Sequence, residues 1–134
     1  MNEAETRAEL IDPKLKKSSW GVVDDSKVMR EYKITAGKIQ TGGNRAKPLI
    51  ADYVLVYHGR KLAIIEAKSA ELEVGEGVAQ AKNYAEMMHL DMTYASNGKE
   101  IYQICMKTGK ESLVVSFPSP EELWNKTFDT QNQL

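Results

Sequence analysis

Residues 49–68 read LIADYVLVYHGRKLAIIEAK, two apolar runs joined by HGR at positions 58–60. The first run alternates as a half-buried strand does, and the second contains LAII at 62–65, typical of a strand covered on both faces. A central glycine in the joining residues favours a tight turn. The stretch therefore predicts an antiparallel β-hairpin, around which the rest of the fold is expected to form.

Acidic side chains are set into both predicted strands. With a three-residue turn at 58–60, Tyr57 would pair with Lys61, and counting back places Asp52 directly opposite Glu66 on one face of the hairpin. Opposed residues have β-carbons about 4.5 to 5.5 Å apart, so two carboxylates there repel each other unless a cation lies between them. The spacing therefore indicates a divalent metal site.

The ligands that this register offers are rich in oxygen. Asp52, Glu66 and a backbone carbonyl suit Mg²⁺, with Mn²⁺ as a substitute, and the single cysteine, Cys105, excludes a zinc cluster. Lys68 is expected on the same face as Glu66 and Leu62. The alternative is a half-exposed hairpin whose polar face carries unrelated charges. Because charges buried at the end of an apolar run are costly unless paired or liganded, we favour the metal site.

These residues resemble a known family. Asp52, followed after a hairpin by Glu66-Ala67-Lys68, is similar to the PD-(D/E)xK nuclease signature, with Ala51 where the proline often is. The segments NEAETRAELID, ADYVLVYHGRKLAIIEAK, QAKNYAE, ASNG and FPSPEELW, in this order, resemble the N-terminal endonuclease domain of type I restriction enzyme R (motor) subunits. The resemblance covers nearly the whole chain.

The resemblance implies an α/β, restriction-endonuclease-like fold, a mixed sheet with a central antiparallel hairpin flanked by helices in an αβββαβ core. It implies Mg²⁺-dependent hydrolysis of DNA without intrinsic sequence specificity, the activity of a type I site-specific deoxyribonuclease. Asp52, Glu66 and Lys68 are then the catalytic residues, and Asp52, Glu66 and the carbonyl of Ala67 the metal ligands.

Supporting residues are also implied. In the resembled family a Gln-x-x-x-Tyr pair after the lysine, here Gln80 and Tyr84, supports the nuclease centre or its DNA contact. Taken alone, Tyr84 is a core aromatic and Gln80 a surface residue. In the wider superfamily an early helix often supplies a further acidic residue, for which Glu9 or Glu5 is the positional candidate; a helix-surface glutamate is the alternative.

DNA contacts must come from local clusters, because the net charge of the chain is -1. The Gly-rich segment GKIQTGGNRAK at 37–47 leads into the first carboxylate strand, so its cluster of Lys38, Arg45 and Lys47 is the favoured phosphate contact. The lysines at 14–17 form a second candidate cluster. A solvated charged surface is the alternative for both clusters.

The remaining elements follow from periodicity and from turn and cap residues. We expect a helix over 2–17 interrupted at Asp12-Pro13, with Trp20 packing it against the sheet. We expect further strands over 28–34, 92–96, 101–106 and 112–117, a helix over 78–90, and a final helix that starts at a Ser119–Glu122 capping box. By the family resemblance, residues 1–128 are expected to form the nuclease domain, and 129–134 a tail or linker toward a helicase motor absent from this chain.

Composition sets the remaining limits. At 134 residues, with 42% hydrophobic and 28% charged residues, the chain fits one globular domain, and no apolar run approaches the roughly 20 residues of a membrane helix. Without a secretory signal we expect a cytoplasmic protein with no membrane partner. No G-x-x-x-x-G-K-[ST] phosphate loop occurs, so ATP is expected to act only through a motor domain absent from this chain.

The resemblance also implies partners. These are double-stranded DNA, a helicase motor domain in the same parent polypeptide, and the specificity and methyltransferase subunits of the restriction complex. Two alternatives stay open: a non-catalytic nuclease-fold scaffold or DNA clamp, and a stand-alone repair or junction nuclease of the same superfamily.

Overall fold

A six-stranded mixed sheet forms the centre of the molecule. The computed structural model describes residues 1–34 and 48–128. The strands lie side by side in sequence order, namely β1 (Ser26–Lys33), β2 (Ile50–Tyr57), β3 (Arg60–Ala67), β4 (Met92–Ser96), β5 (Ile101–Cys105) and β6 (Glu111–Val114). Neighbouring strands are antiparallel except β3 and β4, which are parallel. The structure thus confirms the predicted mixed sheet with a central antiparallel hairpin.

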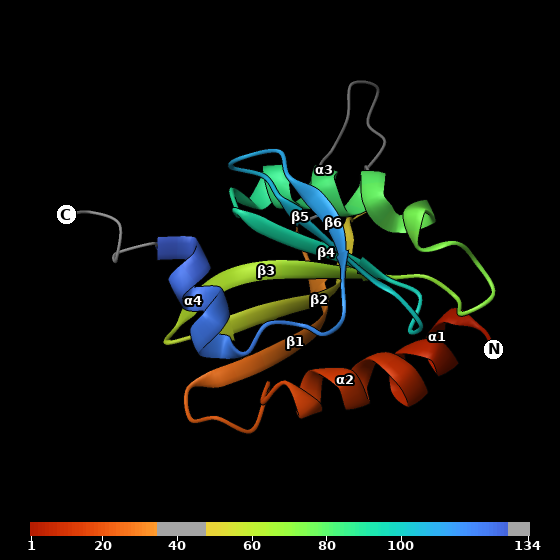
Figure 1. Cartoon of the computed structure of the whole chain (residues 1–134), viewed down its shortest axis with the longest axis horizontal. Helices are drawn as coiled ribbons and strands as arrows, with labels where there is room; N and C mark the ends of the chain where they lie inside the picture. Colours follow the sequence, from red (N-terminus) through yellow and green to blue (C-terminus); the bar gives the residue numbers. More distant parts are fainter. Residues whose placement is uncertain (35–47, 129–134) are drawn as a thin grey trace.

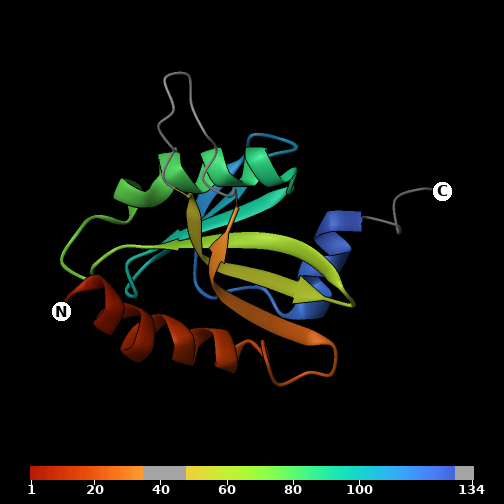
Figure 2. The ribbon, with the colours of Figure 1, turned by 180° about the vertical axis from the view of Figure 1, so that it is seen from behind.

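Helices cover both faces of this sheet (Figures 1 and 2). A continuous N-terminal helical segment lies on one face. The helix α3, preceded by a short 3-10 turn, lies on the other face. The helix α4 lies at one end of the sheet, beside the hairpin. The elements are α1 (Glu3–Thr6), the π-helical turn η1 (Arg7–Ile11), α2 (Asp12–Lys17), the 3-10 turn η2 (Val74–Gly77), α3 (Val78–Met88) and α4 (Pro120–Phe128). The segments β3, α3 and β4 form a parallel crossover.

The interruption predicted at Asp12-Pro13 is a change of helix type rather than a break. Proline has no backbone N–H, so an α-helical pattern would leave one carbonyl of the preceding turn without its donor. The chain instead makes a π turn, in which the N–H of Asp12 donates to the carbonyl of Arg7. Pro13 then begins the next α-helical turn, where a missing N–H is tolerated.

Alternation along the hairpin divides the apolar side chains between two cores. A larger core lies between the sheet and the N-terminal helix, and a smaller one lies between the sheet and α3. The larger core includes Ile11, Leu15, Trp20, Tyr53, Leu55, Leu62 and Tyr94. The smaller core includes Ala51, Val54, Val56, Ile64 and Tyr84. Both faces of the hairpin are therefore buried, as its continuously apolar second strand predicts.

The last strand is shorter than predicted. Instead of running over 112–117, β6 ends at Val114. The cause lies in Phe117, whose side chain is buried in the larger core and whose carbonyl accepts a hydrogen bond of 2.8 Å from Ser18 Oγ. Beyond it, Ser119 and Glu122 form the predicted capping box. The N–H of Ser119 donates to Glu122 Oε1 at 2.8 Å, and the N–H of Glu122 donates to Ser119 Oγ at 3.2 Å.

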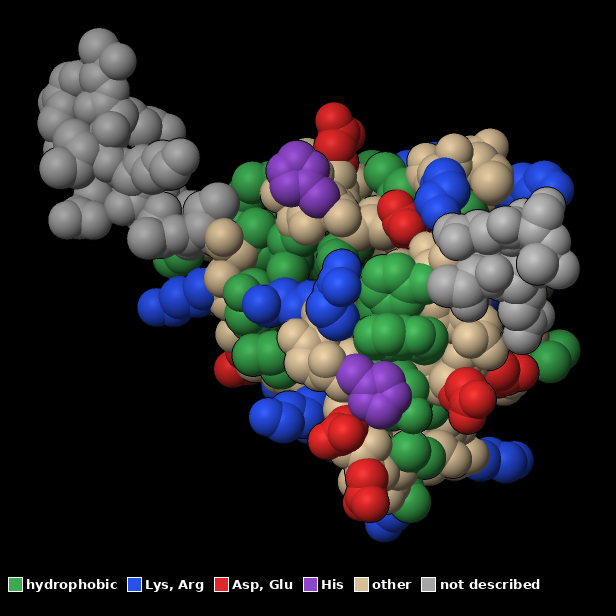
Figure 3. Space-filling view, turned by 90° about the vertical axis from the view of Figure 1, so that its left-hand side faces the viewer, with side chains coloured by type: hydrophobic (Ala, Val, Ile, Leu, Met, Phe, Trp, Pro, Cys, Tyr) green, Lys and Arg blue, Asp and Glu red, His purple; other side chains and the backbone are tan. Residues whose placement is uncertain are grey.

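An aromatic cluster fastens α4 to the tip of the hairpin. Trp124 packs edge-on against Tyr57 and His58, with ring centroids 5.9 and 5.1 Å apart, and the Arg60 guanidinium lies over the Phe128 ring. Figure 3 looks onto this end of the molecule, where hydrophobic side chains gather between lysines and arginines. The tip of the hairpin is thus held at the end opposite its acidic residues. Among residues 1–34 and 48–128, no helix is both long and apolar enough to cross a membrane.

Candidate active site

The hairpin turn is tighter than predicted. It has two residues instead of three, because Tyr57 pairs with Arg60 rather than with Lys61. His58 and Gly59 both have left-handed backbones, with φ of 50° and 75°. Positive φ at both central positions is the arrangement that fits the right-handed twist of a two-residue hairpin, and glycine adopts it without strain.

A β-bulge restores the predicted register beyond the turn. The pairing shifts by one residue between Leu55 and Val56, which leaves Leu62 as the extra residue and turns it into the larger core. Its predicted position on the face of Glu66 is therefore wrong. After the bulge Tyr53 pairs with Ile65, and one further step along the same register places Asp52 opposite Glu66, as predicted. The shorter turn and the unpredicted bulge compensate each other.

The two carboxylates are tied to each other's strands. The backbone N–H of Asp52 donates to Glu66 Oε2 at 3.0 Å, and the N–H of Ala67 donates to Asp52 Oδ2 at 2.8 Å. Glu66 is only 3% exposed, and the Asp52 side chain is 16% exposed. One oxygen of each carboxylate is thus fixed by the backbone, and the other, Asp52 Oδ1 or Glu66 Oε1, is not taken by it.

Burial makes this pair costly to ionise. Burial, followed by the nearby charge of Asp52, raises the pKa of Glu66 to about 8. Burial also raises the pKa of Asp52, although the N–H of Ala67 and the charges of Arg7 and Lys68 oppose the rise. The described protein groups therefore do not neutralise the pair fully, and it retains an affinity for a proton or a cation.

Lys68 lies at the same site. Its charge lowers the pKa of both carboxyl groups, and its backbone N–H donates to the carbonyl of Ser96 at 2.9 Å. The aliphatic part of its side chain runs along Gly77, just before α3; a Cβ built there would lie 3.4 Å from Lys68 Cγ. The described residues show no ion pair within 4 Å for its ammonium group.

Tyr84 of α3 lies near the carboxylates as well, and Gln80 is hydrogen-bonded to it. Gln80 Nε2 donates to the Tyr84 hydroxyl at 2.7 Å. The pKa of Tyr84 is raised by burial first, and the negative charges of Glu66 and Asp52 add to the rise. Tyr84 is buried in the smaller core, as the residue taken alone suggests, and its hydroxyl lies in the field of the acidic pair.

The N-terminal helix brings residues other than the predicted Glu5 and Glu9 to the acidic pair. Glu5 caps the N-terminus of the helix instead of joining the site. Its side chain accepts a hydrogen bond of 3.0 Å from the backbone N–H of Asn2. The site instead receives Arg7, whose Nη1 lies 3.4 Å from Asp52 Oδ1 and 3.2 Å from Glu3 Oε1. The charge of Glu3 also raises the pKa of Asp52. The segment EAETR places Glu3 and Arg7 four residues apart on one helix face, which is the signal that could have found them.

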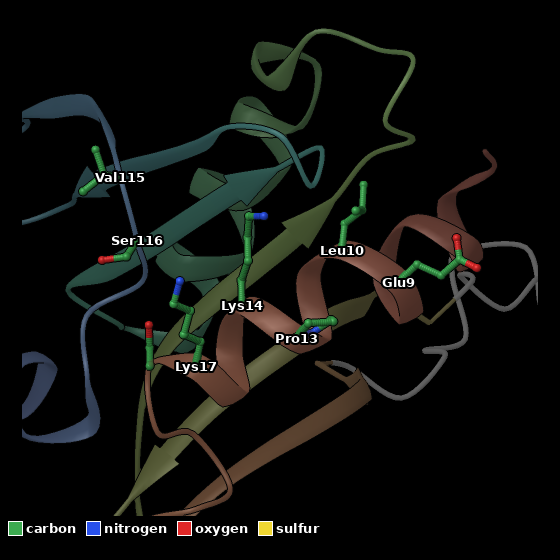
Figure 4. A pocket seen from close by; sticks show the side chains of 8 residues that line it. Glu9, Leu10, Pro13, Lys14, Lys17, Val115 and Ser116 are labelled. Carbon is green, nitrogen blue, oxygen red and sulfur yellow. The ribbon is translucent and has the colours of Figure 1, made fainter.

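Glu9 lies away from the carboxylates. It is exposed and lines a groove of about 540 Å³ between the N-terminal helix and residues 115–116 (Figure 4). Leu10, Pro13, Lys14, Lys17 and Val115 share this groove. The predictions for Lys38, Arg45 and Lys47 fall in 35–47, outside the described residues.

A metal would find few ready ligands here. In the described part of the chain, no three His, Cys, Asp or Glu side chains gather closely enough to hold an ion by themselves. The acidic pair nevertheless fits a hard cation, because it offers two buried, incompletely neutralised carboxylates with one oxygen each beyond its backbone bond. The predicted third ligand, the carbonyl of Ala67, and water would complete the set.

Comparison with known proteins identifies the family. The family model for the second domain of the type I restriction enzyme EcoKI endonuclease subunit matches residues 27–118, which include both carboxylates, Lys68 and the Gln80–Tyr84 pair. The chain belongs to the type I restriction enzyme endonuclease subunits. The N-terminal helix with Glu3 and Arg7 lies outside the matched residues.

Two relatives match a larger share of the chain. The EcoAI endonuclease subunit of Escherichia coli is 31% identical over 94% of the chain, which spans 16% of that protein. A solved fragment described as an HsdR subunit of a type I restriction enzyme from Vibrio vulnificus YJ016 is 38% identical, with a TM-score of 0.87 over 94% of the chain and 25% of the fragment. The chain thus spans at most a quarter of these two relatives and has the fold of the matched part of the solved fragment.

Proposed function

We propose that this chain is the DNA-cleaving domain of a type I restriction endonuclease subunit, with a PD-(D/E)xK site that hydrolyses phosphodiester bonds with Mg²⁺. The observation that carries the proposal is the buried Asp52–Glu66 pair, held by reciprocal backbone hydrogen bonds beside Lys68. Family membership supports a nuclease role for the subunit.

Each site residue has a proposed part. Asp52, Glu66 and the carbonyl of Ala67 would hold the metal, which when bound would lower the pKa of a coordinated water and polarise the phosphate. Lys68 would position the attacking water and stabilise the negative charge that develops on the phosphate. The Gln80–Tyr84 pair would orient the acidic side of the site.

Specificity would reside elsewhere. Cleavage would leave 5′-phosphate and 3′-hydroxyl ends without sequence preference, because recognition would belong to partner specificity and methyltransferase subunits. Double-stranded DNA would be delivered by an ATP-driven helicase motor in the parent polypeptide. Mn²⁺ would substitute for Mg²⁺, since both favour oxygen ligands.

The test is a Mg²⁺-dependent nicking assay on the complete restriction assembly. Asp52→Ala, Glu66→Ala and Lys68→Ala should each lower cutting by at least about a hundredfold while ATP-driven translocation continues. Lys61→Ala and Glu73→Ala remove exposed charges of the same types and should cut normally. Retained cutting by Lys68→Ala would overturn its role. Retained cutting by all three site variants would favour the non-catalytic scaffold or clamp for this domain.

A further inference from the structure

Arg7 holds a position that the proposed function leaves unexplained. Its guanidinium lies between three carboxylates: Asp52 at 3.4 Å, Glu3 at 3.2 Å and Glu31 at 3.9 Å. In the described part of the chain, Arg7 is the one cationic side chain within ion-pair distance of the buried acidic pair. Arg7 itself is 24% exposed, so it lies at the mouth of the site.

The contact with Asp52 uses the oxygen that a metal would need. Asp52 Oδ2 is occupied by the N–H of Ala67, so Oδ1 is the oxygen left for a cation, and Arg7 lies against it. At 3.4 Å this contact is longer than the roughly 2.7 to 2.9 Å of a strong charge-assisted hydrogen bond. The guanidinium is therefore only loosely bound to Asp52.

The backbone of Arg7 is held in place by hydrogen bonds to the π turn. Its carbonyl accepts from the N–H of Asp12 in the π turn, and the Tyr53 hydroxyl donates to Asp12 Oδ1 at 2.7 Å. Glu3 and Glu31 are 43% and 74% exposed, so both can follow the guanidinium outward and keep it paired. A side-chain rotation alone could thus remove Arg7 from Asp52 without leaving its charge unpaired.

We propose that Arg7 is an internal counter-ion that a divalent cation displaces from Asp52 when it enters the site. The inference rests on the proposed metal site and makes Arg7 a positioning residue. In the metal-free protein it offsets the repulsion within the acidic pair. When the cation binds, the guanidinium withdraws toward Glu3 and Glu31, and its residual repulsion sets an upper limit on metal affinity.

Calorimetric titration of the chain with Mn²⁺ tests the exchange. Arg7→Gln removes the competing charge, so its Kd for Mn²⁺ should fall by about three- to tenfold, the size expected for one nearby, partly screened unit charge. Arg7→Lys keeps the charge and should stay within about twofold of the wild type. Arg30→Gln is the matched control, because it removes a positive charge that pairs with Asp12 instead, at 3.3 Å.

The possible outcomes separate the two proposals. Wild-type binding that Asp52→Asn abolishes, together with tighter binding by Arg7→Gln, supports the exchange. An unchanged or higher Kd in Arg7→Gln, with normal wild-type binding, overturns the exchange alone. An equal fall in Arg30→Gln also overturns it, because a general charge effect would then suffice. Absence of Asp52-dependent binding in the wild type overturns the metal site and the exchange together.

Discussion

The orientation of the acidic pair is a property of strand pairing. Each carboxylate accepts a hydrogen bond from a backbone N–H of the opposite strand, Glu66 from Asp52 and Asp52 from Ala67. A shift of one residue in the register would turn one carboxylate to the other face and break both bonds. The chemistry proposed here therefore depends on the hairpin register at least as much as on the identity of the two side chains.

Stability without metal should depend on pH through Glu66. Its pKa is about 8 in the folded chain against 4.5 ordinarily, so between these values the folded state holds a proton that the unfolded state has lost. Stability should therefore fall as the pH rises from about 5 to 8, by a few kcal/mol at most. Urea unfolding in chelator at several pH values measures the loss.

The matched variant is Glu66→Gln, which has no titrating group but keeps an oxygen to accept from the N–H of Asp52. Its stability should be much flatter over the same pH range. A slope equal to that of the wild type would show that another group carries the pH dependence.

At the scale of elements, the N-terminal helix brings Arg7 and Glu3 to the hairpin and packs closely on the turn between β4 and β5. Gly98 in this turn has φ of 84°, and a Cβ there would lie 2.7 Å from Leu10 Cβ and Cδ1. The N–H of Ala70 also donates to Thr6 Oγ1 at 2.9 Å. Contacts at Thr6 and at Leu10 thus hold the helix on either side of Arg7.

Gly98→Ala should test this packing. Its cost combines about 1 to 2 kcal/mol for a left-handed backbone with about 1 to 3 kcal/mol for the contact with Leu10. Gly109→Ala is the control, because Gly109 has φ of 79° but nothing within 4 Å of the added Cβ. In urea unfolding Gly98→Ala should lose more stability than Gly109→Ala. Equal losses would mean that the helix does not pack tightly on this turn.

At the scale of the whole molecule, the proposed metal site would couple metal binding to folding. The carboxylates come from two central strands, and the cores on both faces of the sheet adjoin them. A cation bound only by the folded chain should stabilise it by about 2.7 kcal/mol at a hundred times its Kd. Thermal unfolding at pH 8 should thus show a Tm several degrees higher with Mg²⁺ than with chelator. Asp52→Asn should abolish the increase, and a variant that kept it would place the ion elsewhere.

The sequence predicted the sheet and the position of the acidic pair because both depend on local alternation along one hairpin. Leu62 shows the limit: alternation cannot reveal a bulge, and the register at Asp52 was right only because the shorter turn offset it. Glu9 shows a second limit of sequence-based prediction. Which face of the N-terminal helix meets the sheet depends on packing and on the π turn, and the periodicity of the sequence reveals neither. The roles of the site residues, and those of Arg45 and Lys47, stay predictions.

The attachment of α4 to the hairpin tip has a mechanical consequence. A pulling force applied at the end of α4 would pass through Trp124 and Phe128 to the tip, and then along β2 and β3. Both strands are hydrogen-bonded to neighbours on either side, so a load along their length would be shared by many bonds in shear. The two carboxylates therefore lie on strands that could slide only by breaking hydrogen bonds to neighbours on both sides.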